Sequence, residues 1–237
     1  MGFNVSLGIL ISITTNFWAL FHISLLHQSH KKTKPAIINI PIIIGGNHVS
    51  LYPEEVLNHD CFDIGVIGEG EQTFLEIAMV LTDSNQSNVA KYLKEIKGIV
   101  FRENNRIIKS PPRELIRDID ILPFPEVGIL KIKKYCGCNL RKPYMTMLTS
   151  RGCPFRCFFC SKVPWGDTYR YHSAERVISE IERLIKQFGI KSIDFFDDTF
   201  TISKERVFKI AELIRQKNLR FEFGIMTRAD LVDKELL

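Results

Sequence analysis

The chain has 237 residues, of which 45% are hydrophobic and 25% are charged, a balance typical of globular proteins rather than of disordered or fibrous ones. Its length predicts one large domain or two modest ones. The net charge of +5 comes from Lys and Arg residues scattered along the sequence, so nothing in it favours a nucleic-acid partner.

The chain begins with an apolar segment, residues 3–26, which has no formal charge unless His22 is protonated. It is long enough to span a membrane, but its many Ser, Thr and Asn side chains disfavour that interpretation. We expect a buried parallel strand at residues 5–13 and a helix at about 17–30, because buried parallel strands read as continuous apolar runs. A membrane-anchored metalloprotein that uses residues 3–26 as its span is the alternative.

Strands and helices continue to alternate through the rest of the first half. Apolar runs predict strands at 37–44 and 64–67, and the first of them ends at Gly45-Gly46. Helices are expected at about 53–58 and 72–81. This βαβαβα order predicts a doubly wound parallel sheet. A hairpin at 98–109 and a proline-rich linker at 111–125 follow it.

A second series of strands and helices begins at Tyr144. We expect strands at 144–149, 192–196 and 220–226, with helices at 174–188 and 204–218 between them. The first helix has apolar residues at 3–4 spacing, an amphipathic stripe that predicts core packing rather than a binding function.

Three cysteines stand between the first strand and the first helix of this series: Cys153, Cys157 and Cys160, with Phe159 before the last. A short loop of this kind can place three thiolates around one face of an iron–sulfur cluster and leave one iron open. Zinc ribbons need a second, distant C-x2-C pair, which the sequence lacks. Buried or disulfide-forming cysteines are the structural alternative. Such cysteine usage fits a reducing compartment, so we expect a cytoplasmic protein.

The C-x3-C-x2-C run, with its aromatic residue and the strand before it, resembles the signature of radical SAM enzymes. Other segments, in the same order as in that family, resemble cobalamin-binding-domain radical SAM proteins: residues 42–48, 68–74, 122–125 and 197–200. The resemblance covers nearly the whole chain and implies an α/β protein in two parts. These are a partial doubly wound, Rossmann-like B12-binding parallel sheet and a partial radical SAM (β/α) barrel.

The resemblance also implies domain boundaries. Residues 1–95 would form the partial cobalamin-binding domain, 96–142 a hairpin and linker, and 143–237 the N-terminal half of the barrel. The chain resembles a family member truncated at both ends. No lower axial histidine for cobalt can be assigned, and only three barrel strands are visible.

Particular residues acquire expected roles from the resemblance. Cys153, Cys157 and Cys160 would ligate a [4Fe–4S] cluster. Phe159 would pack beside the adenine of S-adenosylmethionine (SAM), although simple loop packing is the alternative for it.

Two polar residues have roles implied in the same way. Asp198 would accept a hydrogen bond from the SAM ammonium, or else cap the following helix, for which Ser203 is the closer candidate. Arg228 would face the SAM carboxylate or ribose, with a surface salt bridge as its alternative.

In the first half, Ser12, Gly45 and Gly46 match the positions that line the nucleotide tail of cobalamin. The glycine pair alone is weak evidence, because any turn between a strand and a helix favours glycine.

The activity implied is reductive cleavage of SAM to a 5′-deoxyadenosyl radical, followed by cobalamin-dependent methylation or related C–H functionalisation such as cyclisation. A small-molecule or lipid-like substrate and a reducing electron donor such as a flavodoxin or ferredoxin are the expected partners, with no nucleic acid and no stable membrane span. A non-catalytic cobalamin- or metal-binding fragment is the alternative.

Overall fold

The computed structural model describes residues 41–83, 89–135 and 141–236. The described residues fall into two compact units, one of the residues up to 115 together with 163–165, and the other of the remaining residues from 116 onward. The strand predicted at 5–13, including Ser12, lies outside the described residues. Where the functional domains begin and end therefore stays a prediction.

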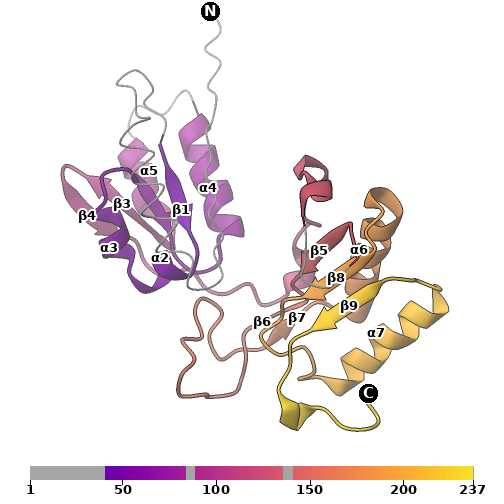
Figure 1. The fold of residues 1–237 in the computed structure, drawn as a ribbon. Helices are drawn as coiled ribbons and strands as arrows, with labels where there is room; N and C mark the ends of the chain where they lie inside the picture. The colour runs from indigo at the N-terminus through magenta and orange to yellow at the C-terminus, as the bar shows by residue number, and fades with distance from the viewer. Residues whose placement is uncertain (1–40, 84–88, 136–140, 237) are drawn as a thin grey trace, which may run out of the picture. The chain divides into compact units, whose positions relative to one another are not determined.

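The first unit contains a sheet of four strands in the order β1-β2-β3-β4 (Figure 1). Strands β1 (Ile43–Gly45) and β2 (Ile64–Val66) are parallel, as the alternating pattern predicted. Strands β3 (Ile99–Glu103) and β4 (Arg106–Lys109) form the predicted hairpin, and β3 pairs antiparallel with β2. The hairpin thus extends the first sheet, which is mixed over its described strands.

Helices cover both faces of this sheet. On one face, α2 (Asn47–Leu51) and α3 (Pro53–Leu57) pack against Ile44 and Val100. On the other, α4 (Glu71–Thr82) and α5 (Val89–Glu95) pack against Ile64 and Phe101. The sequence did not predict α2 or α5. Both are short, and each has only one buried side chain, so neither has a readable apolar stripe.

The second unit contains a parallel sheet in the order β5-β8-β9, formed by β5 (Tyr144–Met147), β8 (Ser192–Phe195) and β9 (Glu222–Ile225). Helix α6 (Ala174–Phe188) connects β5 to β8, and α7 (Lys204–Gln216) connects β8 to β9. The second series is therefore confirmed, with each helix or strand within two residues of its predicted limits. A separate two-stranded sheet, β6 (Ser150–Arg151) with β7 (Arg170–Tyr171), follows β5.

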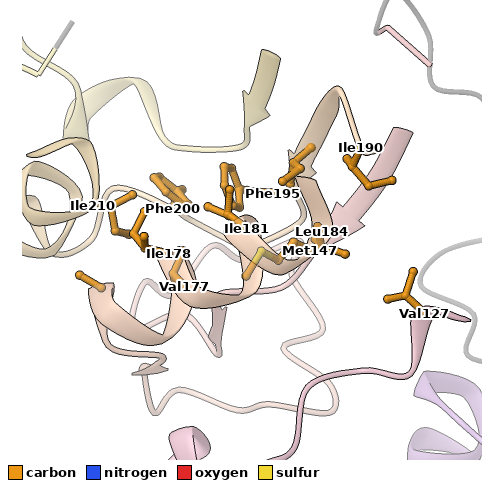
Figure 2. Close-up of a cluster of buried hydrophobic side chains, with 12 residues drawn as sticks. Val127, Met147, Val177, Ile178, Ile181, Leu184, Ile190, Phe195, Phe200 and Ile210 are labelled. Atoms are coloured by element: carbon orange, nitrogen blue, oxygen red, sulfur yellow. The ribbon is translucent and has the colours of Figure 1, made fainter. Parts of the chain in front are cut away.

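The core of the second unit lies between the sheet and the two helices (Figure 2). The apolar stripe of α6 packs on Ile193 and Phe195 of β8, which are fully buried or nearly so. Ser173 caps the start of α6 by accepting a hydrogen bond from the Arg176 backbone N–H at 3.1 Å. The helix ends at Gly189, whose φ of 65° is left-handed. Stripe and caps together explain why its predicted limits were correct.

The segment before β5 lies along α6 and contains three one-turn helices, η1 (Ile119–Ile121), η2 (Val127–Ile129) and η3 (Ile132–Lys134). The Arg176 guanidinium stacks 3.5 Å from the centre of the Phe124 ring and donates to the Leu122 carbonyl. Two turns later, Arg183 donates to the Pro125 carbonyl at 2.9 Å. The Leu-Pro-Phe-Pro sequence at 122–125 is therefore bound to the surface of α6.

No helix in the described part of the chain is both long enough and apolar enough to cross a membrane.

Candidate functional site

The cysteine loop, residues 153–160, follows β6 at the carboxyl end of the parallel sheet. Cys153 and Cys157 are half-buried and Cys160 is exposed, and all three are free thiols. The Cys160 backbone N–H donates to the Cys157 carbonyl at 3.0 Å, which forms a turn between the last two cysteines. In (β/α) folds this end of the sheet is where functional groups gather.

Gly152 is required by the backbone that leads into this loop. Its φ is +82°, and a Cβ at this position would lie 2.3 Å from the Thr168 carbonyl oxygen. Another residue would therefore be both strained and in collision with backbone. Only glycine lets the loop pass this close to the returning chain.

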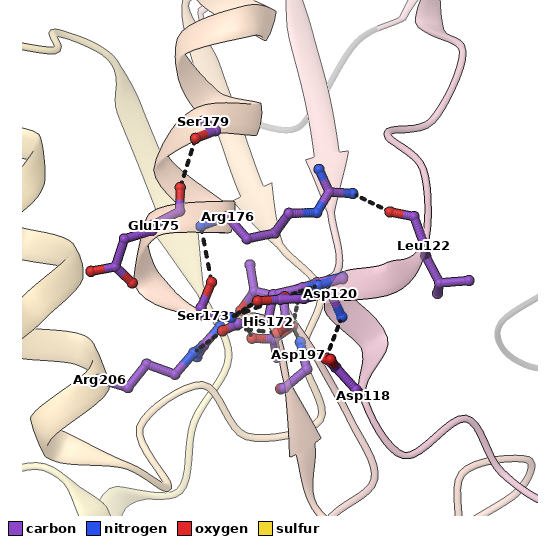
Figure 3. Close-up of polar contacts among 12 residues, drawn as sticks. Asp118, Asp120, Leu122, His172, Ser173, Glu175, Arg176, Ser179, Asp197 and Arg206 are labelled. Atoms are coloured by element: carbon purple, nitrogen blue, oxygen red, sulfur yellow. Dashed lines mark hydrogen bonds and ion pairs between the residues drawn. The ribbon is translucent and has the colours of Figure 1, made fainter.

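Asp197, two residues after the end of β8, binds the chain at Thr149 and Ser150, between β5 and the cysteine loop (Figure 3). Its carboxylate is completely buried. One carboxylate oxygen accepts from the backbone N–H groups of Thr149, at 2.6 Å, and Ser150, at 2.9 Å. The other accepts from the Thr149 hydroxyl. The buried charge therefore fixes the point at which the chain turns from β5 into the cysteine loop.

Arg206 binds the carbonyl group of Thr149, the residue whose N–H group Asp197 binds. Its Nη2 donates to the Thr149 carbonyl and its Nε to the His172 carbonyl, at 2.9 and 2.8 Å. Sequence reasoning missed both Asp197 and Arg206 as supports of the loop. The contacts span 48 residues for Asp197 and 57 for Arg206, so no local pattern reveals them.

Asp120 of η1 links the preceding segment to this network. It accepts from His172 Nδ1 at 2.9 Å and from the Ser173 backbone N–H at 3.1 Å. Burial opposes ionisation of Asp120, but the hydrogen bonds from Ser173 and His172 prevail and lower its pKa. Burial also lowers the pKa of His172, in spite of its carboxylate partner. The neutral imidazole thus donates its Nδ1 proton to a carboxylate.

Asp198, a predicted SAM contact, is exposed beside the buried Asp197. Neighbouring protein atoms still desolvate its carboxyl group, and this, together with the Asp197 charge, raises its pKa. Phe159 is 81% exposed, with its ring edge-on to Phe158 at 5.6 Å. Both side chains are therefore accessible, and their roles stay predictions.

Arg228, between β9 and the one-turn helix η4 (Ala229–Leu231), reaches the cysteine loop. Its Nη1 donates to Cys157 Sγ at 3.3 Å, and its Nε and Nη2 donate to the two Asp230 oxygens at 2.9 and 2.7 Å. The guanidinium also lies 4.3 Å from the centre of the Phe155 ring. Hydrogen bonding to Asp230 raises the pKa of Arg228 and lowers that of Asp230, so both groups are charged.

In the first unit, Gly45 and Gly46 end β1, as predicted. Gly46 has a φ of 113°, a conformation that favours glycine. The Ser50 hydroxyl donates to the Gly46 carbonyl at 2.9 Å and accepts from the Gly68 backbone N–H at 2.9 Å, which joins the turns after β1 and β2. The predicted contact of the two glycines with cobalamin is not tested by this geometry.

No group of three His, Cys, Asp or Glu side chains within the described residues converges as a ready-made metal site. The donor set nevertheless fits an iron–sulfur cluster, since three free thiols share one short, irregular loop and a cation contacts one of the sulfurs. Thiolates are the ligands that such clusters use.

The chain is similar in sequence to known proteins. Residues 147–237 match the model of the radical SAM superfamily. An uncharacterized methyltransferase of Pyrococcus horikoshii is 37% identical over 200 residues, which cover 84% of this chain and 42% of the relative. The anaerobic magnesium-protoporphyrin IX monomethyl ester cyclase of Cereibacter sphaeroides is 29% identical over 219 residues, covering 89% and 34%. The chain thus spans less than half the length of these relatives.

Solved structures show the same fold. The cobalamin-dependent SAM radical enzyme OxsB, with aqua-cobalamin bound, aligns with a TM-score of 0.70 and 23% identity over 96% of this chain and 32% of that one. The radical SAM methyltransferase TsrM of Kitasatospora setae, with cobalamin and a [4Fe–4S] cluster bound, aligns with a TM-score of 0.62 and 18% identity, covering 89% and 40%. The predicted α/β fold with parallel sheets is confirmed, and residues 147–237 of the chain are similar to the radical SAM superfamily.

Proposed function

We propose that this chain is the part of a radical SAM enzyme that binds a [4Fe–4S] cluster, SAM and cobalamin. The observation that carries the proposal is the cysteine loop itself, three free thiols at the carboxyl end of a parallel sheet. Buried contacts from Asp197 to Thr149 and Ser150 fix where that loop begins.

Cys153, Cys157 and Cys160 would hold the cluster and leave its fourth iron for SAM. The bound cluster supplies the electron that cleaves SAM to methionine and a 5′-deoxyadenosyl radical. Asp198, an exposed carboxyl three residues after the end of β8, would accept a hydrogen bond from the SAM ammonium. Phe159 would cover the adenine, because its exposed ring offers an apolar face beside the loop.

Cobalamin would bind to the first unit, at the carboxyl ends of β1 and β2. This edge of an open α/β sheet is where ligands commonly bind. Gly45 and Gly46 leave room there for a flat ring, and Ser12 is a further candidate contact from sequence. Support also comes from OxsB and TsrM, whose structures hold cobalamin and share this fold.

The reaction we propose is cobalamin-dependent methylation, with cyclisation or related C–H functionalisation as the other outcomes. Relatives described as methyltransferases and as cyclases support both. The substrate would be a small or lipid-like molecule, and a flavodoxin or ferredoxin would supply the electron. An oxygen-sensitive cluster requires a reducing compartment, so we place the protein in the cytoplasm.

Anaerobic reconstitution tests the proposal. Iron and sulfide are counted, and the EPR spectrum of the reduced protein is recorded with and without SAM. We expect a four-iron signal that changes on addition of SAM and is lost in Cys157→Ala. Cys61→Ala is the matched control, because Cys61 is a buried cysteine of the first unit.

Absence of a cluster, or a signal indifferent to SAM, would overturn the cluster proposal. Cobalamin binding is measured separately by absorbance. Binding of cobalamin without SAM cleavage would favour the alternative of a non-catalytic cobalamin-binding fragment.

A further inference from the structure

We infer that Arg228, acting with Asp230, sets the reduction potential of the cluster through a hydrogen bond to the Cys157 sulfur. This inference rests on the proposed function, since it requires Cys157 to be a cluster ligand. It assigns Arg228 to the iron–sulfur cluster rather than to the SAM carboxylate or ribose.

All three nitrogens of the Arg228 guanidinium donate hydrogen bonds. Nε and Nη2 bind the two carboxylate oxygens of Asp230 in a fork, at 2.9 and 2.7 Å. This pairing fixes the plane of the group and points Nη1 at Cys157 Sγ, 3.3 Å away. The Phe155 ring, 4.3 Å from the guanidinium carbon, covers one face. A planar group fixed on three sides is a hydrogen-bond donor of defined direction rather than a mobile surface charge.

A donor at this position acts on the electron affinity of the cluster. Reduction adds one electron, supplied in vitro by dithionite, and makes the cluster with its thiolates one unit more negative. No bond forms or breaks. A positive charge and an N–H group at a ligand sulfur stabilise the more negative state, so they raise the potential. The Asp230 carboxylate opposes part of this effect.

The Arg228–Asp230 pair therefore provides variants with opposite expected signs. Arg228→Ala removes the hydrogen bond and one positive charge, and should shift the midpoint potential to a more negative value. Asp230→Asn keeps the cation and removes its counter-charge, which should shift the potential to a more positive value. The double variant has the same total charge as the wild-type pair, so its remaining negative shift reports the hydrogen bond together with the part of the Arg228 charge that Asp230 does not cancel.

Arg156 offers a matched control for charge. It is adjacent to Cys157 in sequence and pairs with Asp167 at 3.7 Å, but its side chain is 86% exposed. Arg156→Ala removes the same charge beside the same cysteine, at a position that water and salt screen. We expect it to shift the potential less than Arg228→Ala does.

The experiment is an EPR-monitored redox titration of the reconstituted 237-residue chain and these variants, with iron and sulfide counted in each sample. Opposite shifts in Arg228→Ala and Asp230→Asn, with a small shift in Arg156→Ala, would support the inference. Should Arg228→Ala assemble no cluster, Asp230→Asn decides by its positive shift or the lack of one.

Failure of the inference and failure of the proposed function give different results. A wild-type cluster whose potential is unchanged in both Arg228→Ala and Asp230→Asn overturns the inference alone. Absence of a cluster in the wild-type chain overturns both. A purely structural role for Arg228 would lower the iron content or the melting temperature of the variants without moving the potential of the cluster that remains.

Discussion

The two units hold their strand-end loops by different chemistry. In the first, one neutral hydroxyl, that of Ser50, joins the turns after β1 and β2 by two hydrogen bonds of 2.9 Å. In the second, two buried charged groups, Asp197 and Arg206, bind Thr149 from opposite sides. Neutral hydrogen bonds contribute about 1 kcal/mol each, whereas a buried charge that loses its partners costs about 3–5 kcal/mol. The cysteine loop is therefore anchored far more strongly than the glycine turn.

The largest expected effect comes from removing the buried carboxylate. Asp197→Ala leaves two backbone N–H groups and the Thr149 hydroxyl without their acceptor, and should lower the free energy of unfolding of the second unit by about 3–5 kcal/mol. Hydrogen exchange of peptides covering residues 144–172 measures this. Asp198→Asn, at the exposed neighbour, is the matched control and should change exchange little. Equal effects of the two substitutions would contradict the comparison.

Next in size is Gly152→Ala. The left-handed φ of +82° and the collision with the Thr168 carbonyl should cost about 3 kcal/mol and displace the cysteine loop. We expect the variant to lose iron on reconstitution while its far-ultraviolet circular dichroism is retained. Gly166→Ala is a control for the cost of the left-handed backbone alone, because Gly166 is also left-handed but a Cβ added there would meet no atom within 4 Å. Equal iron loss in both variants would show that the collision is unimportant.

A smaller effect is expected at Asp120. Asp120→Ala removes a charge-assisted hydrogen bond to His172 and two to Ser173, at a cost of about 1.5–3 kcal/mol. Thermal unfolding of the variant measures this loss.

The pH dependence provides a second test of the Asp120–His172 pair. The pKa of His172 is lowered from 6.5, so its stabilising contribution is complete above that pH and is lost as pH falls through its folded value. The Asp120 contribution, with a pKa lowered from 3.8, is lost at still lower pH. Thermal unfolding from about pH 7.5 to about pH 5 should show a declining melting temperature that flattens in His172→Gln. A wild-type profile that rises as the pH is lowered would contradict this assignment.

The smallest loss of stability is expected on removal of the Ser50 hydroxyl, which joins the turns after β1 and β2. Ser50→Ala should destabilise the first unit by about 1 kcal/mol, because it leaves the Gly68 N–H without its hydroxyl acceptor. Hydrogen exchange of peptides covering residues 43–68 measures this, and exchange of the cysteine loop should not change. An effect as large as that of Asp197→Ala would remove the distinction between the two loops.

Much of the second unit could be predicted because its signals are local. Helix α6 combines an apolar stripe with Ser173 at its start and Gly189 at its end, and these fix its limits. The cysteine spacing likewise lies within eight residues. Helices α2 and α5 were missed because five and seven residues hold too few turns to show a period.

The supports of the site were beyond sequence reasoning for a different reason. Asp197 and Asp198 are adjacent and chemically identical, and only the pleat of the chain after β8 buries one and exposes the other. Sequence reasoning therefore selected the exposed member as a ligand contact and overlooked the buried one. The contact of Arg228 with Cys157 joins residues 71 positions apart and could not be predicted from a local pattern, and the expected role of Arg228 at SAM stays a prediction.

The close approach at Gly152 also has a use in the study of related genes. A reading frame that preserves the three thiols but carries any larger residue before the first of them would encode a loop unable to follow this path. Glycine and first cysteine should accordingly be treated as one unit when sequences are sorted. Such a criterion separates chains able to build the loop from decayed copies that retain only its cysteines.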